Sequence, residues 1–217
     1  MVIKQISFKH GWFYHYRVHN PKSEELLQDF SGLHKYLYDM FENCPHEHFE
    51  GGPRGSALKF NIPMLDKKQI VGHEVSSLTK IGLEVNEERY KSAHSKVQVF
   101  MLEKDNNTIA VEVPIWLHPE ELEVYEKTFD STEPLTGHID VLRIEDGKVW
   151  VWDYKPKASK EKYACTQTFF YALMLSRRTG IPLEKFRCGY FDQFFAYIFE
   201  PKEELLLKDV QEPLIIK

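Results

Sequence analysis

The segment GHIDVLRIEDGKVWVWDYKP, residues 137–156, constrains the fold of this chain more than any other. The Asp146-Gly147 pair in its middle is preferred at the centre of a two-residue type I′ turn, so an antiparallel hairpin is expected here. Counting outward from this turn places Asp140 directly opposite Asp153, with Cβ atoms about 4.5–5.5 Å apart. Because side chains alternate between the two faces of a strand, Lys155 lies on the same face as Asp153. The segment therefore predicts two facing carboxylates beside a lysine.

Two facing carboxylates repel each other, and a bound cation resolves that conflict. A solvated sheet face is the alternative, but apolar residues on both faces of the hairpin indicate that both faces are covered. A third carboxylate, Glu112, interrupts the alternating strand TIAVEVPIWL at 108–117; an ordinary outward-facing carboxylate is the competing interpretation. Oxygen ligands suit Mg²⁺ or Mn²⁺. Such an ion lowers the pKa of a bound water, and Lys155 beside it can stabilise charge on phosphorus, so phosphodiester hydrolysis is the predicted chemistry.

The other segments predict an α/β fold in the order helix, three strands, helix, strands, with a mixed central sheet flanked by helices. In the first half of the chain we expect two strands at 2–19, one helix at 21–41 with Ser23 as N-cap, a Gly- and Pro-rich loop at 44–63 and a long amphipathic helix at 83–103. A strand at 108–117, a short acidic helix from Pro119 and the hairpin follow. The last elements are a helix at 161–178, which ends before Gly180, and the strands FRCGYFDQ and FFAYIFEP.

Composition narrows the class of protein. With 42% hydrophobic and 14% aromatic residues, 217 residues can bury the core of one domain with an appended subregion. A net charge of −5 argues against a wholly basic protein that coats nucleic acid, although it leaves room for a local basic groove. No apolar run approaches the roughly 20 residues of a membrane span, and the start lacks the apolar core of a signal peptide. A cytoplasmic protein without membrane contact is expected.

Three further features have competing interpretations. Cys44, His46 and His48 alternate in CPHEHFE, but without a visible fourth ligand this stretch is interpreted as a polar loop rather than a metal site. The basic run KPKASKEK, which begins at Lys155, can follow a nucleic-acid backbone or form a solvated loop. The aromatic run WFYHY at 12–16 can stack bases, but a hydrophobic strand is favoured.

Three motifs resemble the PD-(D/E)xK nuclease superfamily, in particular its RecB-like branch: GHID at 137–140, DYK at 153–155 and QTFFY at 167–171. They occur in the expected order on a strand, a strand and a helix, and the resemblance covers roughly residues 83–200. It implies a restriction-endonuclease-like core at 81–217 with an N-terminal extension at 1–80. It also implies a metal-dependent deoxyribonuclease, an exonuclease of RecB-like type, in which Asp140, Asp153 and Tyr154 bind Mg²⁺ or Mn²⁺, Lys155 is catalytic, and Gln167 and Tyr171 support the site.

The chain also departs from this branch. Members often carry a histidine in the helix before the first core strand, where this chain has Val85 and Asn86; Glu87 and His94 are the candidates to replace it. Three scattered cysteines predict no iron–sulfur cluster. No Walker loop is visible, so any helicase or repair and recombination partner is a separate chain. Two alternatives remain open: a nuclease-fold module with weak or no catalysis that binds nucleic acid or partner proteins, and a nuclease that acts on RNA.

Overall fold

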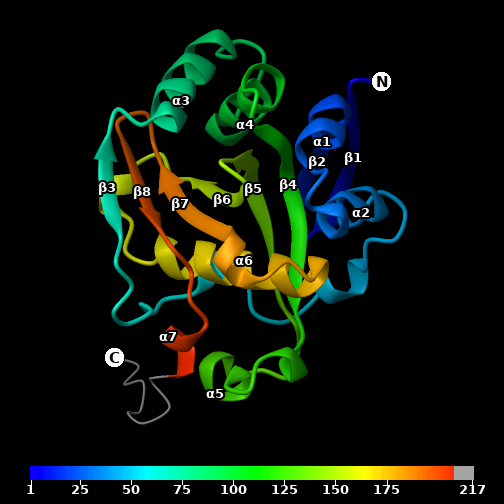
Figure 1. Cartoon of the computed structure of the whole chain (residues 1–217), viewed down its shortest axis with the longest axis vertical. Helices are drawn as coiled ribbons and strands as arrows, with labels where there is room; N and C mark the ends of the chain where they lie inside the picture. Colours follow the sequence, from blue (N-terminus) through cyan, green and yellow to red (C-terminus); the bar gives the residue numbers. More distant parts are fainter. Residues whose placement is uncertain (208–217) are drawn as a thin grey trace.

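The computed structural model describes residues 1–207, which contain one eight-stranded mixed sheet between two layers of helices (Figure 1). Neighbouring strands are antiparallel, except for one parallel pair, β6 and β7. This arrangement confirms the predicted α/β fold with its mixed central sheet. In sheet order, the strands are β1 (Ile3–His10), β2 (Trp12–His19), β4 (Thr108–Leu117), β5 (Leu135–Glu145), β6 (Lys148–Tyr154), β7 (Phe186–Phe191), β8 (Phe195–Phe199) and β3 (Lys68–Val71).

Apolar helix faces cover both sides of the sheet. Helix α6 crosses one face and packs in a large apolar cluster with α1 and α2, whereas α3 and α4 pack in a second cluster on the opposite face (Figure 1). Helix α6 also connects the parallel strands β6 and β7, and it ends at Gly180 as predicted. The helices are α1 (Asn20–Leu26), α2 (Ser31–Asp39), α3 (Glu74–Val85), α4 (Ala93–Lys104), α5 (Tyr125–Phe129), α6 (Ala164–Thr179) and α7 (Glu204–Leu207).

The predicted hairpin is formed by β5 and β6. Asp146 and Gly147 both have positive φ angles, 50° and 65°, as a type I′ turn requires. The predicted register holds from the pair Glu145 and Lys148 as far as Val141 and Trp152. One step further, the Asp140 carboxylate accepts a hydrogen bond from the backbone N–H of Tyr154 at 2.9 Å, in a region where no ladder pair joins the two strands. The two strands of the hairpin thus stop pairing at the end that carries Asp140 and Asp153.

Strand β4 does not keep the strict alternation that its sequence predicts. Val111 packs in the second apolar cluster, but Val113 packs in the first, although residues two apart on a regular strand share a face. Glu112 between them has a left-handed backbone with φ 55°, which breaks the pleat. Val141 and Ile139 on β5 show the same change of cluster around Asp140. Glu112 is therefore not the ordinary outward-facing residue of the competing interpretation: its side chain lies at the point where both strands change faces.

Two predicted single helices are each broken in two. The helix predicted at 21–41 is α1 and α2, separated by a turn at 27–30. Ser23 is not the N-cap but a buried residue inside α1; His19 caps α1 by accepting the N–H of Lys22 at 3.4 Å. Pro21 occupies the first turn of α1, where its fixed φ is already helical.

The helix predicted at 83–103 is the end of α3 followed by α4. The Ser92 side chain accepts the N–H of Ser95 at 3.0 Å and so starts a new helix. The buried amide of Asn86 donates to the carbonyl of Lys96 at 2.9 Å, which fixes the angle between the two helices. This break places Glu87 in an exposed connection and His94 in the first turn of α4.

The first 80 residues contribute strands to the same sheet as the rest of the chain. Strand β2 pairs with β4, and β3 pairs with the opposite edge strand β8. The predicted acidic helix after Pro119 is a short 3₁₀ turn followed by α5. The domain division at residue 80 stays a prediction, and residues 208–217 of the predicted core lie outside the described residues. None of the helices within residues 1–207 has both the length and the apolar character needed to cross a membrane.

Candidate metal centre

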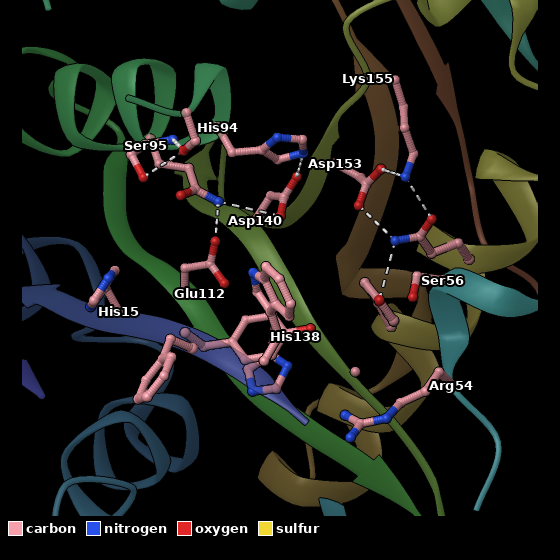
Figure 2. Close-up of a pocket in the computed structure, with 18 of the residues that line it drawn as sticks. His15, Arg54, Ser56, His94, Ser95, Glu112, His138, Asp140, Asp153 and Lys155 are labelled. Atoms are coloured by element: carbon pink, nitrogen blue, oxygen red, sulfur yellow. Dashed lines mark hydrogen bonds and ion pairs between the residues drawn. The ribbon is translucent and has the colours of Figure 1, made fainter. Parts of the chain in front are cut away.

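A pocket of about 330 Å³ lies where β2, β4, β5 and β6 meet the start of α4 and the middle of α6. Figure 2 shows its labelled residues, among them Glu112, Asp140, Asp153 and Lys155. The three carboxylates come from three adjacent strands, β4, β5 and β6. The pairing of Val111 with Val141 and of Val113 with Ile139 brackets Glu112 and Asp140 opposite each other. The predicted set of carboxylates is therefore brought together in one pocket.

Two of these carboxylates have buried oxygens that no hydrogen bond satisfies. The amide of Gln98 on α4 donates to Glu112 Oε1 at 2.6 Å and to Asp140 Oδ1 at 3.3 Å. Among the described residues, no hydrogen bond reaches Glu112 Oε2 or Asp153 Oδ2. Asp153 Oδ2 is nevertheless compensated by the Lys155 ammonium, whose Nζ lies 2.8 Å away, so Glu112 Oε2 is the oxygen left without a partner. A buried oxygen without a donor is costly, and a hard divalent cation would satisfy it. The donor set thus fits the predicted all-oxygen site.

Burial and mutual repulsion raise the pKa values of two of the acids. Desolvation and then the neighbouring Asp140 charge raise the pKa of Glu112 to about 8. Desolvation raises the pKa of Asp153 to about 6, with Lys155 opposing the shift and Asp140 adding to it. A divalent cation favours the ionised forms and must displace their protons. Metal binding by this pocket is therefore expected to strengthen as the pH rises from about 6 to 8.

Replacing Glu112 with glutamine is expected to stabilise the metal-free protein at high pH. The folded-state pKa, about 8, exceeds the ordinary value of 4.5, so between these values the unfolded chain loses a proton that the folded chain keeps. Stability is therefore lost as the pH rises through these values, by up to about 5 kcal/mol at pH 9. Thermal unfolding in EDTA should show the melting temperature of Glu112→Gln exceeding wild type by up to about 10–20 °C at pH 9 and by little at pH 5.

The exposed Glu87 supplies the matched control, because Glu87→Gln makes the same chemical change away from the pocket. Its melting temperature should follow that of wild type at every pH. If the difference between Glu112→Gln and wild type were the same at pH 5 and pH 9, the buried-acid interpretation of Glu112 would be wrong.

Lys155 is held by a chain of side chains that ends on α6. Its Nζ lies 2.8 Å from Asp153 Oδ2 and donates to Gln167 Oε1 at 2.9 Å. The Gln167 amide donates to Asp153 Oδ1 at 2.7 Å and contacts the Tyr171 hydroxyl at 3.1 Å. Burial opposes the lysine charge, but the Asp153 carboxylate outweighs it, and the pKa of Lys155 is raised. The lysine is thus a positioned cation at neutral pH, and Gln167 and Tyr171 orient it together with Asp153.

Gly137 makes room for this chain of contacts. A Cβ atom at Gly137 would lie 2.3 Å from the ring carbon Cε1 of Tyr171 and 2.9 Å from its hydroxyl. Gly55, in the loop between η1 (His46–Phe49) and β3, meets the same ring at 2.4 Å. The Tyr171 ring is therefore packed between the backbones of two glycines, Gly55 and Gly137.

The structure distinguishes the two candidates for the helix histidine. His94 Nε2 lies 3.7 Å from Asp140 Oδ2 (Figure 2). The His94 ring packs edge-on against Tyr154. Glu87 is exposed and does not line the pocket. Glu87 and His94 do not lie on one helix as predicted, because the helix expected at 83–103 breaks between α3 and α4. Tyr154 takes part through its backbone N–H, while its side chain is buried in the second apolar cluster.

Several residues of the pocket were not predicted from the sequence to belong to the site. Gln98 lies on a helix whose buried face was expected to be apolar, so its polarity was the one available signal. Arg54 comes from the Gly- and Pro-rich loop and donates to the carbonyls of His10 and Phe49, the first at 3.0 Å. His138, a residue of the GHID motif with no role assigned from the sequence, is buried in the pocket wall and stacks on Tyr14 at 3.6 Å between ring centroids.

Comparison with known families agrees with this geometry. The sequence matches the model of the PD-(D/E)XK nuclease superfamily over residues 12–203, so the match includes β2 and the segment leading to β3 as well as the pocket. None of the curated proteins gives a significant match. Together with the observed sheet and flanking helices, the match identifies the predicted restriction-endonuclease-like fold.

Proposed function

Because the chain belongs to the PD-(D/E)XK nuclease superfamily, whose members generally use divalent metal ions, we propose that it is an Mg²⁺- or Mn²⁺-dependent deoxyribonuclease. The observation that carries the proposal is the convergence of Glu112, Asp140 and Asp153 on one pocket beside Lys155. These acids hold the ion through their carboxylate oxygens. The ion, when bound, supplies an acidified water and neutralises phosphate charge.

The protein residues have separable roles in this proposal. Lys155, protonated because Asp153 raises its pKa, donates to the phosphate oxygens and stabilises the charge that develops on them. Gln167 fixes both Lys155 and Asp153, and Tyr171 fixes Gln167. We assign His94 to the position of the helix histidine, 3.7 Å from Asp140. The binding-module alternative was motivated by the absence of such a histidine, and His94 removes that motive.

The rim of the pocket supports a nucleic-acid substrate with accessible bases. Trp12 and Phe13 begin β2, line the pocket and are 77% and 64% exposed, so the hydrophobic strand expected at 12–16 presents two rings to solvent. Arg17 and Arg54 on the same wall add positive charge inside a chain of net charge −5. Exposed rings stack bases, and the arginines neutralise phosphates. The proposed substrate is a DNA end at which bases are unpaired, and the proposed activity is that of an exonuclease of RecB-like type.

Replacing Trp12 with alanine is expected to weaken binding of single-stranded DNA by about 5- to 100-fold, the value of one stacked base. Fluorescence anisotropy of a labelled oligonucleotide in EDTA measures this without cleavage. Phe194→Ala is the control, because Phe194 is also an exposed aromatic residue, 59% accessible, but does not line the pocket. Equal affinities of the two variants would exclude Trp12 from the DNA-binding surface.

The proposed activity is tested with purified protein and end-labelled single-stranded DNA, double-stranded DNA and RNA in Mg²⁺, Mn²⁺ or EDTA. Cleavage of DNA in metal and not in EDTA is expected, with mononucleotides or short products appearing from one end. Internal products would replace the exonuclease assignment with an endonuclease. Cleavage of RNA alone would replace the substrate, and binding of DNA without any cleavage would favour the binding module.

A further inference from the structure

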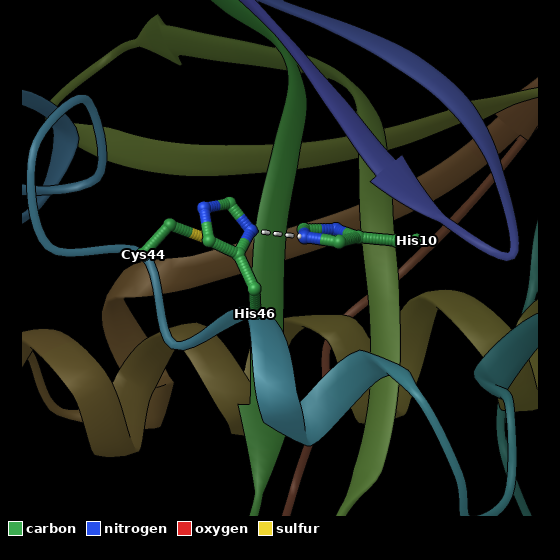
Figure 3. Close-up of side chains that lie close together, drawn as sticks. All are labelled: His10, Cys44 and His46. Atoms are coloured by element: carbon green, nitrogen blue, oxygen red, sulfur yellow. Dashed lines mark hydrogen bonds between the residues drawn. The ribbon is translucent and has the colours of Figure 1, made fainter.

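A second group of metal-binding side chains lies outside the catalytic pocket. His10 at the end of β1, Cys44 before η1 and His46 at the start of η1 each offer a ligand atom, and these atoms all lie within 4.8 Å of one another (Figure 3). His10 and Cys44 are buried, whereas His46 is exposed. From these positions we propose a second metal site that binds a thiophilic divalent ion of the Zn²⁺ class.

The two histidines already face each other in the manner of two ligands. His10 Nε2 and His46 Nδ1 are 2.8 Å apart, so one of these nitrogens donates its hydrogen to the lone pair of the other. Two nitrogens bound to one tetrahedral Zn²⁺ are about 3.3 Å apart, given bond lengths of about 2.0–2.1 Å. An opening of about 0.5 Å therefore replaces the shared hydrogen by an ion. Because His46 is on the surface, this movement does not disturb the buried core.

The second nitrogen of His10 is also held. His10 Nδ1 lies 2.9 Å from His138 Nε2, and the His10 ring stacks on Phe49 with centroids 3.9 Å apart. With Nδ1–H donating to His138, Nε2 of His10 is left as a lone pair that points at His46. Such a hydrogen bond behind a ligating histidine is the usual way in which proteins fix its tautomer and ring orientation.

The donor set separates this site from the catalytic one. Two imidazoles and a thiolate favour Zn²⁺ and similar ions, whereas the carboxylates of the pocket favour Mg²⁺ or Mn²⁺. Binding releases the thiol proton of Cys44 to solvent, and the proton on His46 Nδ1 is exchanged through solvent to His46 Nε2, which leaves Nδ1 free to ligate. A water completes four-coordination on the side of His46. The bound ion would join the β1–β2 hairpin to η1. Through His138, which stacks on Tyr14, it braces the wall of the catalytic pocket.

Metal binding alone tests the proposal, without any measurement of cleavage. Metal-stripped protein is titrated with Zn²⁺, and with Co²⁺ as a spectroscopic probe. One Zn²⁺ per chain and Co²⁺ visible bands of tetrahedral intensity, with a thiolate charge-transfer band in the near ultraviolet, are expected. Cys44→Ala should remove the charge-transfer band. His46→Ala should weaken Zn²⁺ binding by at least about 100-fold, because losing a group behind a ligand already costs about 10- to 100-fold.

Two controls keep the result specific. Cys165→Ala removes a partly accessible thiol away from the cluster and should bind Zn²⁺ as wild type does. Asp140→Asn removes a catalytic-site carboxylate and should leave the Co²⁺ charge-transfer band unchanged. The exposed position of His46 makes His46→Ala informative even if Cys44→Ala fails to fold. A Co²⁺ spectrum without a thiolate band, or wild-type Zn²⁺ affinity in His46→Ala, would overturn the proposal.

Discussion

Substitution of Lys155 by alanine is expected to lower the rate of DNA cleavage by about 10³-fold while the chain stays folded. The ammonium group is 20% exposed and is aimed into the pocket by Asp153 and Gln167, so its loss removes a preorganised positive charge from the reacting phosphate. The loss of one such donor in a desolvated site costs about 10²- to 10³-fold in turnover. Single-turnover cleavage of end-labelled DNA in Mg²⁺ measures the effect.

An indirect effect of this substitution has to be separated from the direct one. Lys155 opposes the rise in the pKa of Asp153, so its removal raises that pKa further and weakens metal binding at neutral pH. Cleavage by Lys155→Ala should therefore be measured at pH 7 and 9 and at saturating Mg²⁺. An activity that stays low throughout supports direct action on the phosphate. Full recovery at high pH and high metal would show that Lys155 only tunes Asp153.

Lys157→Ala is the matched control for Lys155→Ala. Lys157 is an exposed lysine two residues further along the chain and does not line the pocket. Its removal should lower the rate of cleavage by less than the loss of one phosphate contact would. The dependence of DNA affinity on salt concentration measures the size of that loss. A loss in Lys157→Ala as large as that in Lys155→Ala would mean that general basic charge, rather than the placement of Lys155, determines the rate.

Replacing Asp140 with asparagine is expected to abolish metal-dependent cleavage and to weaken metal binding by at least about 100-fold. Asp140 stands between the other two carboxylates in the sheet, and its charge raises the pKa of both Glu112 and Asp153. The asparagine oxygen can still accept the N–H of Tyr154, which Asp140 accepts at 2.9 Å. The backbone at the hairpin opening is thus preserved while the central ligand charge is lost. Direct ligands are expected to matter at least as much as the groups behind them.

Calorimetric titration with Mn²⁺ measures the metal affinity, and unfolding in EDTA measures the cost to the fold. Without metal, Asp140→Asn should be at least as stable as wild type above pH 7, because it removes repulsion between buried acids. Asp146→Asn in the same hairpin is the control, since asparagine is equally suited to the type I′ turn. Wild-type Mn²⁺ affinity in Asp140→Asn would place the metal elsewhere.

The hairpin and the three motifs could be predicted because their determinants are local. The Asp146-Gly147 turn sets the register of the strands that carry Asp140 and Asp153, and the spacing of Gln167 and Tyr171 sets their common helix face. The break before α4 was missed because it depends on Ser92 as a capping residue, and the break before α2 has no side-chain cap that would signal it. These signals are short and compete with a continuous apolar pattern.

The remaining parts of the site depend on contacts between distant segments, which periodicity does not encode. The left-handed backbone of Glu112 reverses the pleat of a strand that its sequence shows as regular. Gln98 and Arg54 reach the pocket only because α4 and the loop before β3 fold against the sheet. In the same way, His10 meets Cys44 and His46 only when the β1–β2 hairpin closes over η1. The position of these residues in the sequence therefore predicts neither which residues they contact in the fold nor what they do there.

The contact between Gly137 and Tyr171 makes the packing of the three motifs depend on one another. Gly137, the first residue of the first motif, leaves the space that is filled by Tyr171, the last residue of the third motif. Tyr171 contacts Gln167, and Gln167 holds Asp153 and Lys155 of the second motif. Sequence drift at one of these positions therefore constrains the others. A methyl group at position 137 should be tolerated only after the ring at 171 has been lost, so these residues are expected to evolve in a fixed order rather than independently.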